Sequence, residues 1–287
     1  MDMLPDRKAI FEGIKTFVVL PDLSRMPEDF LSHFFLEGYE VYYILDDPHL
    51  DLYARTRVLL TLFPQTMLFF NIERKAEMPW PELIRRIKEE QGARARIGVL
   101  YGSQTDAQTR RELQRTYLYD IGIDCGCIPL EYRKPENLAR LTSVLAANQA
   151  KGRRKFLRAV CDSTCTVSLV HSGIRHEGKI RDISISHFSC VFAEGGPKLE
   201  LKEKLQRVQL RLSGMVCAVE AIVRAKREVS GELLYIFAFC EARSFEGLSP
   251  EIRTKINDFI HTHFRKRVGD MVRAGVAEVW AHPESVA

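Results

Sequence analysis

The chain has 287 residues, of which 46% are hydrophobic and 28% are charged, and its formal net charge is +4. This is the composition of an ordinary folded protein, which excludes a disordered or fibrous chain, and the length suits two domains. The apolar runs are far too short to span a bilayer, and the first residues lack the layout of a signal peptide, so we expect no membrane insertion. Seven cysteines without a framework of spacings suit a reducing compartment, and we expect a cytoplasmic protein.

Short apolar runs alternate with amphipathic stretches over residues 1–149. The runs that we expect to form strands are Thr16–Leu20, Val41–Leu45, Thr66–Asn71, Arg96–Tyr101 and Cys125–Leu130. The stretches that we expect to form helices are Pro27–Gly38, Asp51–Phe63, Pro81–Glu90, Asp106–Tyr117 and Glu136–Asn148. Continuous apolar strands separated by helices are typical of a parallel sheet that is covered on both faces. The pattern therefore predicts a flavodoxin-like, doubly wound α/β domain.

This half also resembles a response-regulator receiver domain. Asn71 ends the third expected strand, Met78-Pro79 precedes the next helix, and Lys134-Pro135 precedes the last one. In receivers the position of Asn71 belongs to a phospho-accepting aspartate, and an amide cannot form an acyl phosphate. Only Asp22 is acidic after the first strand, so the carboxylate cluster that would hold Mg²⁺ is incomplete. We expect either a pseudo-receiver that is used for contacts or an unrelated α/β module.

A basic segment, residues 150–159, connects the two halves of the chain. Its cations, with no acid among them, are Lys151, Arg153, Arg154, Lys155 and Arg158. Such a run predicts an anionic partner at this point. DNA would require a longer basic face and a recognisable reading element, so we expect no nucleic-acid binding.

The second half consists of short β-type runs with glycine or serine turns. The expected strands are Thr164–Val170, Ile174–Ser184, Phe188–Ala193, Lys204–Leu212, Val216–Lys226 and Leu233–Ala242. Many short strands of this kind favour a barrel. Ser249-Pro250 is a strong helix start, and an apolar stripe continues from there to about Val268. We expect a six-stranded antiparallel barrel with a closing helix over residues 160–270, followed by a C-terminal tail of residues 271–287.

Two short motifs carry the functional prediction. Arg154 and Arg158 form R-x-x-x-R in a loose linker, and Asp182, Ser184 and His187 form D-x-S-x-x-H. The planar fork of arginine binds phosphate oxygens or the O6/N7 edge of guanine. If Asp182 and Ser184 lie on one strand, they share a face, where the carboxylate can accept from guanine N–H groups. The two motifs, in this order and followed by the barrel and helix, resemble the PilZ signature R-x-x-x-R and [DN]-x-S-x-x-G.

The resemblance implies a PilZ-type barrel that binds cyclic di-GMP, a bacterial second messenger. The ligand-binding residues that it implies are Arg154, Arg158, Asp182, Ser184 and His187, with Arg153 as an additional candidate. We expect a non-catalytic effector without cofactor or metal, in which the ligand reorients the two domains to signal to a protein partner of unknown identity. His187 stands at the position of the motif glycine, which leaves an alternative open. In that alternative the chain is a degenerate PilZ-like protein–protein interaction module that does not bind nucleotide.

Other constellations do not indicate a site. Cys125, Cys127, Cys161 and Cys165 have spacings that are poor for structural zinc, and we expect them to be core residues. The two histidines His261 and His263 lie two apart on the expected helix and point in different directions. No nucleophile stands beside a base in the sequence, so we expect no catalytic residues.

Overall fold

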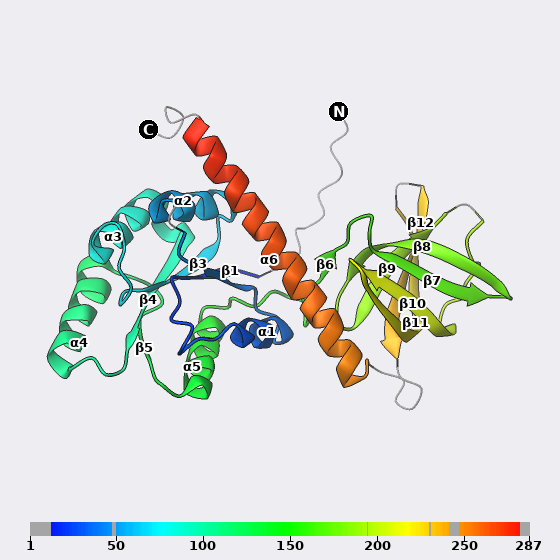
Figure 1. Cartoon of the computed structure of the whole chain (residues 1–287), viewed down its shortest axis with the longest axis horizontal. Helices are drawn as coiled ribbons and strands as arrows, with labels where there is room; N and C mark the ends of the chain where they lie inside the picture. Colours follow the sequence, from blue (N-terminus) through cyan, green and yellow to red (C-terminus); the bar gives the residue numbers. More distant parts are fainter. Residues whose placement is uncertain (1–12, 48–49, 194, 230, 241–246, 282–287) are drawn as a thin grey trace. The chain divides into compact units, whose positions relative to one another are not determined.

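The computed structural model of the chain describes residues 13–47, 50–193, 195–229, 231–240 and 247–281 (Figure 1). Contacts within the chain separate two compact units. The α/β unit comprises the residues up to Lys155 together with those from Arg265 onward, and the barrel unit comprises Phe156–Phe264. The predicted domain limits 1–149 and 160–270 differ somewhat from these units, and they stay a prediction.

Five parallel strands form the sheet of the α/β unit, in the order β2-β1-β3-β4-β5. The strands are β1 (Lys15–Val19), β2 (Val41–Ile44), β3 (Thr66–Asn71), β4 (Ala95–Gly102) and β5 (Cys127–Leu130). All residues of β3 are buried, which explains the unbroken apolar run of residues 67–70 at its centre. The strand order is that of a flavodoxin-like fold, and the predicted fold class of this half is confirmed.

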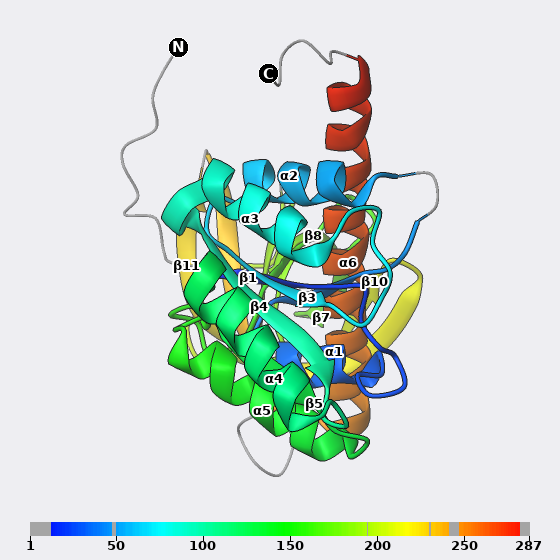
Figure 2. The same ribbon diagram turned by 90° about the vertical axis from the view of Figure 1, so that its left-hand side faces the viewer.

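Helices cover both faces of this sheet (Figures 1 and 2). The helices of one face are α1 (Asp29–Leu36) and α5 (Lys134–Ala147), and those of the other include α2 (Leu52–Leu62) and α3 (Trp80–Gln91). Phe34 of α1 and Leu141 of α5 belong to one buried cluster with Met67 of β3. The remaining helical segments are η1 (Gly92–Arg94), α4 (Ala107–Gln114) and the π-helical η2 (Arg115–Ile121).

Six antiparallel strands close into a barrel in the second unit. The strands are β7 (Thr166–His171), β8 (Ile174–Ile183), β9 (His187–Phe192), β10 (Lys204–Leu212), β11 (Met215–Val229) and β12 (Glu232–Cys240). They pair in the order β8-β7-β10-β11-β12-β9, and β9 pairs back onto β8, so that no long edge of the sheet is left open. The rings of Phe188 and Phe237 stack in the interior with their centroids 4.8 Å apart. The predicted six-stranded barrel is confirmed.

One short strand was not predicted. The segment β6 (Ala159–Val160), which spans the boundary between the predicted linker and the predicted barrel, pairs with the last residues of β8. Its two residues are too few for a periodic pattern, so that only the tertiary structure reveals it.

The C-terminal helix α6 (Pro250–Ala281) is longer than expected. Its predicted end near Val268 is wrong, and the residues 271–281 of the predicted tail are helical. Val268, Val272 and Val276 are buried at intervals of four residues, so the apolar stripe continues through the second part of the helix. None of the described helices is long and apolar enough to cross a membrane.

Candidate functional site

The basic segment is anchored to the α/β unit where it begins. Lys151 forms an antiparallel bridge with Gly13, and its Nζ lies 5.7 Å from the centroid of the Tyr39 ring. Gly38, at φ +86°, allows the backbone of Lys155 to pass close to it, because a Cβ at Gly38 would lie 2.9 Å from the backbone oxygen of Lys155. The expectation of a loose linker is therefore wrong for the first residues of this segment.

The two arginines of the R-x-x-x-R motif fall into different units. Arg153 is exposed and Arg154 is half-buried, and both lie in a bend that extends to Phe156. The contacts divide the chain between Lys155 and Phe156, so Arg154 belongs to the α/β unit and Arg158 to the barrel unit.

Arg158 and Asp182 join the two motifs. Arg158 comes immediately before β6, and β6 pairs with the end of β8, with Val160 opposite Asp182. This pairing brings Arg158 Nη1 to 3.3 Å from Asp182 Oδ1. The side chains are 34% and 24% exposed, so the ion pair is accessible from solvent.

A β-bulge sets the direction of Asp182. The register between β8 and β9 shifts between Ile180 and Asp182, so that Ile180 and Ile183 both point into the core although they are three residues apart. Asp182 lies opposite Ser189 of β9, and Ser189 Oγ donates a hydrogen bond of 2.7 Å to Asp182 Oδ2. Ser189 is buried, and we had not predicted it, because strand pairing was needed to place it.

Ser184 builds the turn between β8 and β9. It is buried, and its Oγ accepts hydrogen bonds from the backbone nitrogens of His187 at 3.1 Å and Ser186 at 3.3 Å. Its backbone nitrogen donates to the carbonyl oxygen of His187 at 2.8 Å. The expectation that Asp182 and Ser184 share a face of one strand is wrong, because β8 ends at Ile183. Ser184 thus positions both His187 and the end of β8, and its contact with a ligand stays a prediction.

His187 fits its position without backbone strain. It is the first residue of β9, it pairs with Ala238 of β12, and its φ is not positive. Its Nδ1 lies 2.9 Å from Ser186 Oγ. Burial, together with the charges of Arg158 and Arg224, lowers the pKa of His187 from its ordinary value of 6.5. The lowered pKa favours the neutral ring, and sequence analysis did not identify Arg224 as one of its causes.

This arrangement combines donors and acceptors that suit a nucleotide. The guanidinium of Arg158 has five N–H donors, so its contact with Asp182 leaves donors for a phosphate or a guanine edge. The carboxylate of Asp182 has lone pairs that can accept from guanine N–H groups. An anionic ligand with a purine base could accept hydrogen bonds from Arg158 and donate them to Asp182.

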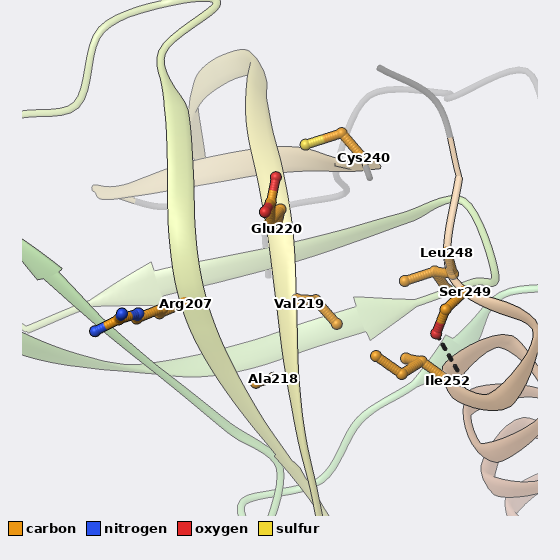
Figure 3. Close-up of a pocket in the computed structure, with 8 residues that line it drawn as sticks. All are labelled: Arg207, Ala218, Val219, Glu220, Cys240, Leu248, Ser249 and Ile252. Atoms are coloured by element: carbon orange, nitrogen blue, oxygen red, sulfur yellow. Dashed lines mark hydrogen bonds between the residues drawn. The ribbon is translucent and has the colours of Figure 1, made fainter. Parts of the chain in front are cut away.

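A cavity of about 310 Å³ lies elsewhere on the barrel unit (Figure 3). It is lined by Arg207, Ala218, Val219, Glu220, Cys240, Leu248, Ser249 and Ile252. The carboxylate of Glu220 is paired with Lys204 Nζ at 2.8 Å, and most of the remaining wall is apolar. No residue of the two motifs lines this cavity, so it is separate from the candidate site.

The cysteines give no sign of a metal site. All seven are free, and burial raises the pKa of the Cys127 thiol to about 11, so that it stays protonated at neutral pH. Within the described ranges, no group of three or more histidine, cysteine or acidic residues is arranged to hold a metal ion.

The carboxyl end of the parallel sheet is the second place where a ligand could be expected. Asn71 ends β3 there and is buried, with Nδ2 donating to the carbonyl oxygen of Leu20 at 2.9 Å and Oδ1 accepting from the backbone nitrogen of Glu73 at 3.2 Å. Both polar atoms of the Asn71 amide are thus hydrogen-bonded within the protein. The resemblance to receivers stays a prediction.

An arginine fills the space next to Asn71. Arg25 Nη1 lies 2.7 Å from Glu73 Oε2, and the guanidinium lies 5.0 Å from the centroid of the Tyr132 ring. A Cβ at Gly102 would lie 2.6 Å from Glu73 Oε1 and 2.8 Å from Arg25 Nη1, so that the pair packs directly onto the β4 backbone. Protein side chains therefore occupy this part of the crevice.

No family model matches the sequence, and a search of the curated proteins finds no match. Solved structures match part of the chain. The PilZ domain with c-di-GMP of YcgR from Escherichia coli is 14% identical, and the match covers 41% of this chain and 96% of that domain with a TM-score of 0.35. The Bacillus subtilis inhibitor of motility (MotI/DgrA) is 18% identical, with 42% of this chain and 55% of that one covered and a TM-score of 0.32.

The PlzA protein of Borreliella burgdorferi in complex with c-di-GMP is 15% identical, with 46% of this chain and 48% of that one covered and a TM-score of 0.26. The chain thus spans about half the length of the last two proteins. The barrel unit is a closed six-stranded antiparallel barrel with a following helix, which is the layout that the sequence resemblance implied. All three TM-scores lie below 0.5, so these similarities do not identify a ligand of this chain.

Proposed function

We propose that the chain is a non-catalytic effector that binds cyclic di-GMP. The observation that supports this most is the pair of Arg158 and Asp182, which joins the two halves of the motif at one end of the barrel. Arg158 and Arg154 would hold phosphate and guanine, with Arg153 as an additional contact. Asp182 would accept from the N1–H and N2–H groups of a guanine.

The remaining motif residues act at the same place. Ser184 holds the turn that places His187 beside Arg158, and its hydroxyl is a candidate contact for phosphate or base. The neutral imidazole of His187 offers a flat aromatic surface on which a guanine can stack.

The ligand would also act on the arrangement of the two units. The chain passes between the units twice, once between Lys155 and Phe156 and once within α6 between Phe264 and Arg265. A ligand that is bound by both Arg154 and Arg158 has higher affinity for the arrangement in which both reach it. It therefore shifts the population toward that arrangement, which a protein partner would recognise.

Isothermal titration calorimetry of the full chain with cyclic di-GMP tests the proposal. We expect micromolar or tighter binding by the wild type, and at least a tenfold loss in Arg154→Ala and in Arg158→Ala, because hydrogen bonds to charged groups are worth about 1.5–3 kcal/mol. The matched control is Arg175→Ala, which removes an exposed arginine at the far end of β8. No heat with the wild type, or equal affinity in all variants, would overturn the proposal.

A further inference from the structure

Arg224 occupies a β-bulge in the wall of the barrel unit. In the pairing of β11 with β12, Val223 lies opposite Phe237 and Ala225 lies opposite Ile236, which leaves Arg224 as the extra residue. Its side chain is exposed. Bulges redirect the side chain that they carry, so the strand alternation does not determine where Arg224 points.

The strand pairing shows which residues lie within reach of this side chain. His187 of β9 pairs with Ala238 of β12, which in turn pairs with Ile222 of β11. Ala238 carries only a methyl group, so a long side chain from β11 can pass over it toward β9. After burial and the charge of Arg158, the charge of Arg224 is a further cause of the lowered pKa of His187, which agrees with a guanidinium on this side of the barrel.

The other cations near His187 and Cys240 have anionic partners. Arg158 is paired with Asp182 at 3.3 Å, and Lys204 is paired with Glu220 at 2.8 Å. Glu220 and Cys240 lie close together on the two strands (Figure 3). Arg224 makes no hydrogen bond or ion pair with any residue that the structure describes. It is thus a positive charge without a described counter-ion beside the candidate site.

We propose that Arg224 is a third arginine of the dinucleotide site and that it binds a phosphate of the ligand. This inference rests on the proposed function and extends it. In the closed barrel, β9 lies between β8 and β12. Arg158 comes immediately before β6, which pairs with β8, and Arg224 lies on β11, which pairs with β12, so the two arginines lie on strands to either side of His187. A cyclic dinucleotide carries two phosphates. A ligand over His187 therefore has a cation available on each side.

Calorimetry with cyclic di-GMP tests the role of Arg224. We expect Arg224→Ala to weaken binding about 10- to 100-fold, because a hydrogen-bonded charge contact is lost. Arg224→Lys, which keeps the positive charge that a phosphate requires, should stay within about fivefold of the wild type. The matched control is Arg227→Ala, an exposed arginine further along β11, and it should bind like the wild type.

A ligand-free measurement tests the geometry. NMR titration of His187 should give a higher pKa in Arg224→Ala than in the wild type, because a positive charge beside the imidazole is removed. The other groups near the ring, Arg158 and Ser186, are unchanged in this variant. An unchanged pKa would contradict the placement of the guanidinium.

The outcomes separate the two proposals. Wild-type binding with unchanged affinity in Arg224→Ala would overturn only the role of Arg224. If Arg224→Lys loses as much affinity as Arg224→Ala, the contact is not with a phosphate, and this assignment is wrong. No binding by the wild type would overturn the proposed function and the role of Arg224 with it.

Discussion

Each unit of the chain has an arginine–carboxylate pair where a ligand could be expected. In the α/β unit, Arg25 and Glu73 lie 2.7 Å apart at the carboxyl end of the sheet, and in the barrel unit Arg158 and Asp182 lie 3.3 Å apart. The side chain of Arg25 is only 12% exposed, whereas that of Arg158 is 34% exposed. Both pairs join an arginine to a carboxylate, but the access of the arginine to solvent differs.

The surroundings explain this difference. Arg25 packs onto Gly102, lies over Tyr132 and also has Asp22 Oδ2 at 3.5 Å from its Nε, so protein atoms surround much of its guanidinium. Arg158 is paired with Asp182, and its side chain keeps greater access to solvent. An arginine can bind a ligand only if it has unused N–H donors and is accessible from solvent. Of the two arginines compared, Arg158 meets this condition better than Arg25.

The comparison of the two regions would be wrong if removal of either carboxylate changed the affinity for the ligand equally. We expect Asp182→Ala to weaken binding of cyclic di-GMP about 100-fold, or roughly 2.8 kcal/mol, because it removes the guanine acceptor and leaves Arg158 and Ser189 without their partner. Glu73→Ala, the matched change in the α/β unit, should bind like the wild type. Calorimetry measures both, and an equal loss in the two variants would contradict the comparison.

Removal of Arg25 should affect stability rather than binding. Arg25→Ala loses a partly exposed ion pair and the contact with Tyr132, and we expect the α/β unit to be destabilised by about 1–2 kcal/mol. Hydrogen exchange of peptides from β1, β3 and β4 measures this locally. Arg133→Ala, an exposed arginine paired with Glu136, is the control and should cost less than about 0.5 kcal/mol. Weaker ligand binding in Arg25→Ala would show that the crevice and the barrel site are not independent.

His187 should have a smaller effect than its position in the motif suggests. Its backbone does not need a glycine, so the effect expected of His187→Gly is the loss of the ring on which a guanine can stack, about fivefold weaker binding of cyclic di-GMP, or near 1 kcal/mol. Both His187→Gly and His187→Ala lose the ring, and only glycine adds backbone freedom. Calorimetry of the two variants therefore separates these two effects on affinity. Binding that appears only in His187→Gly and is absent from the wild type would favour the alternative, a degenerate interaction module.

No effect is expected from phosphorylation of the α/β unit. Asn71 cannot form an acyl phosphate, and the Arg25–Glu73 pair occupies the adjacent space. Incubation with acetyl phosphate and Mg²⁺ should therefore give no labile adduct by intact-protein mass spectrometry. An adduct that maps to this unit would contradict the view of the crevice as filled.

Much of the fold could be predicted because its elements are long and periodic. The buried strand β3 and the alternating strand β10 were each predicted with the bounds that the structure has. The helix α6 was predicted too short, because its stripe of valines beyond Val268 is interrupted by charged and glycine residues that weaken the pattern. The strand β6 has two residues, and a strand this short depends on its partner rather than on its own sequence.

The sequence alone determined the order of the elements and the residue types of both motifs, since periodicity and spacing are local properties of the chain. Only the tertiary structure decided which of these residues meet. The bulge in β8 sets the direction of Asp182, which meets Arg158 and Ser189, the turn after Ile183 engages Ser184, and the bulge in β11 falls at Arg224. Bulges and strand pairing arise from contacts between distant segments, and a one-residue shift of register moves a side chain to the other face of the sheet.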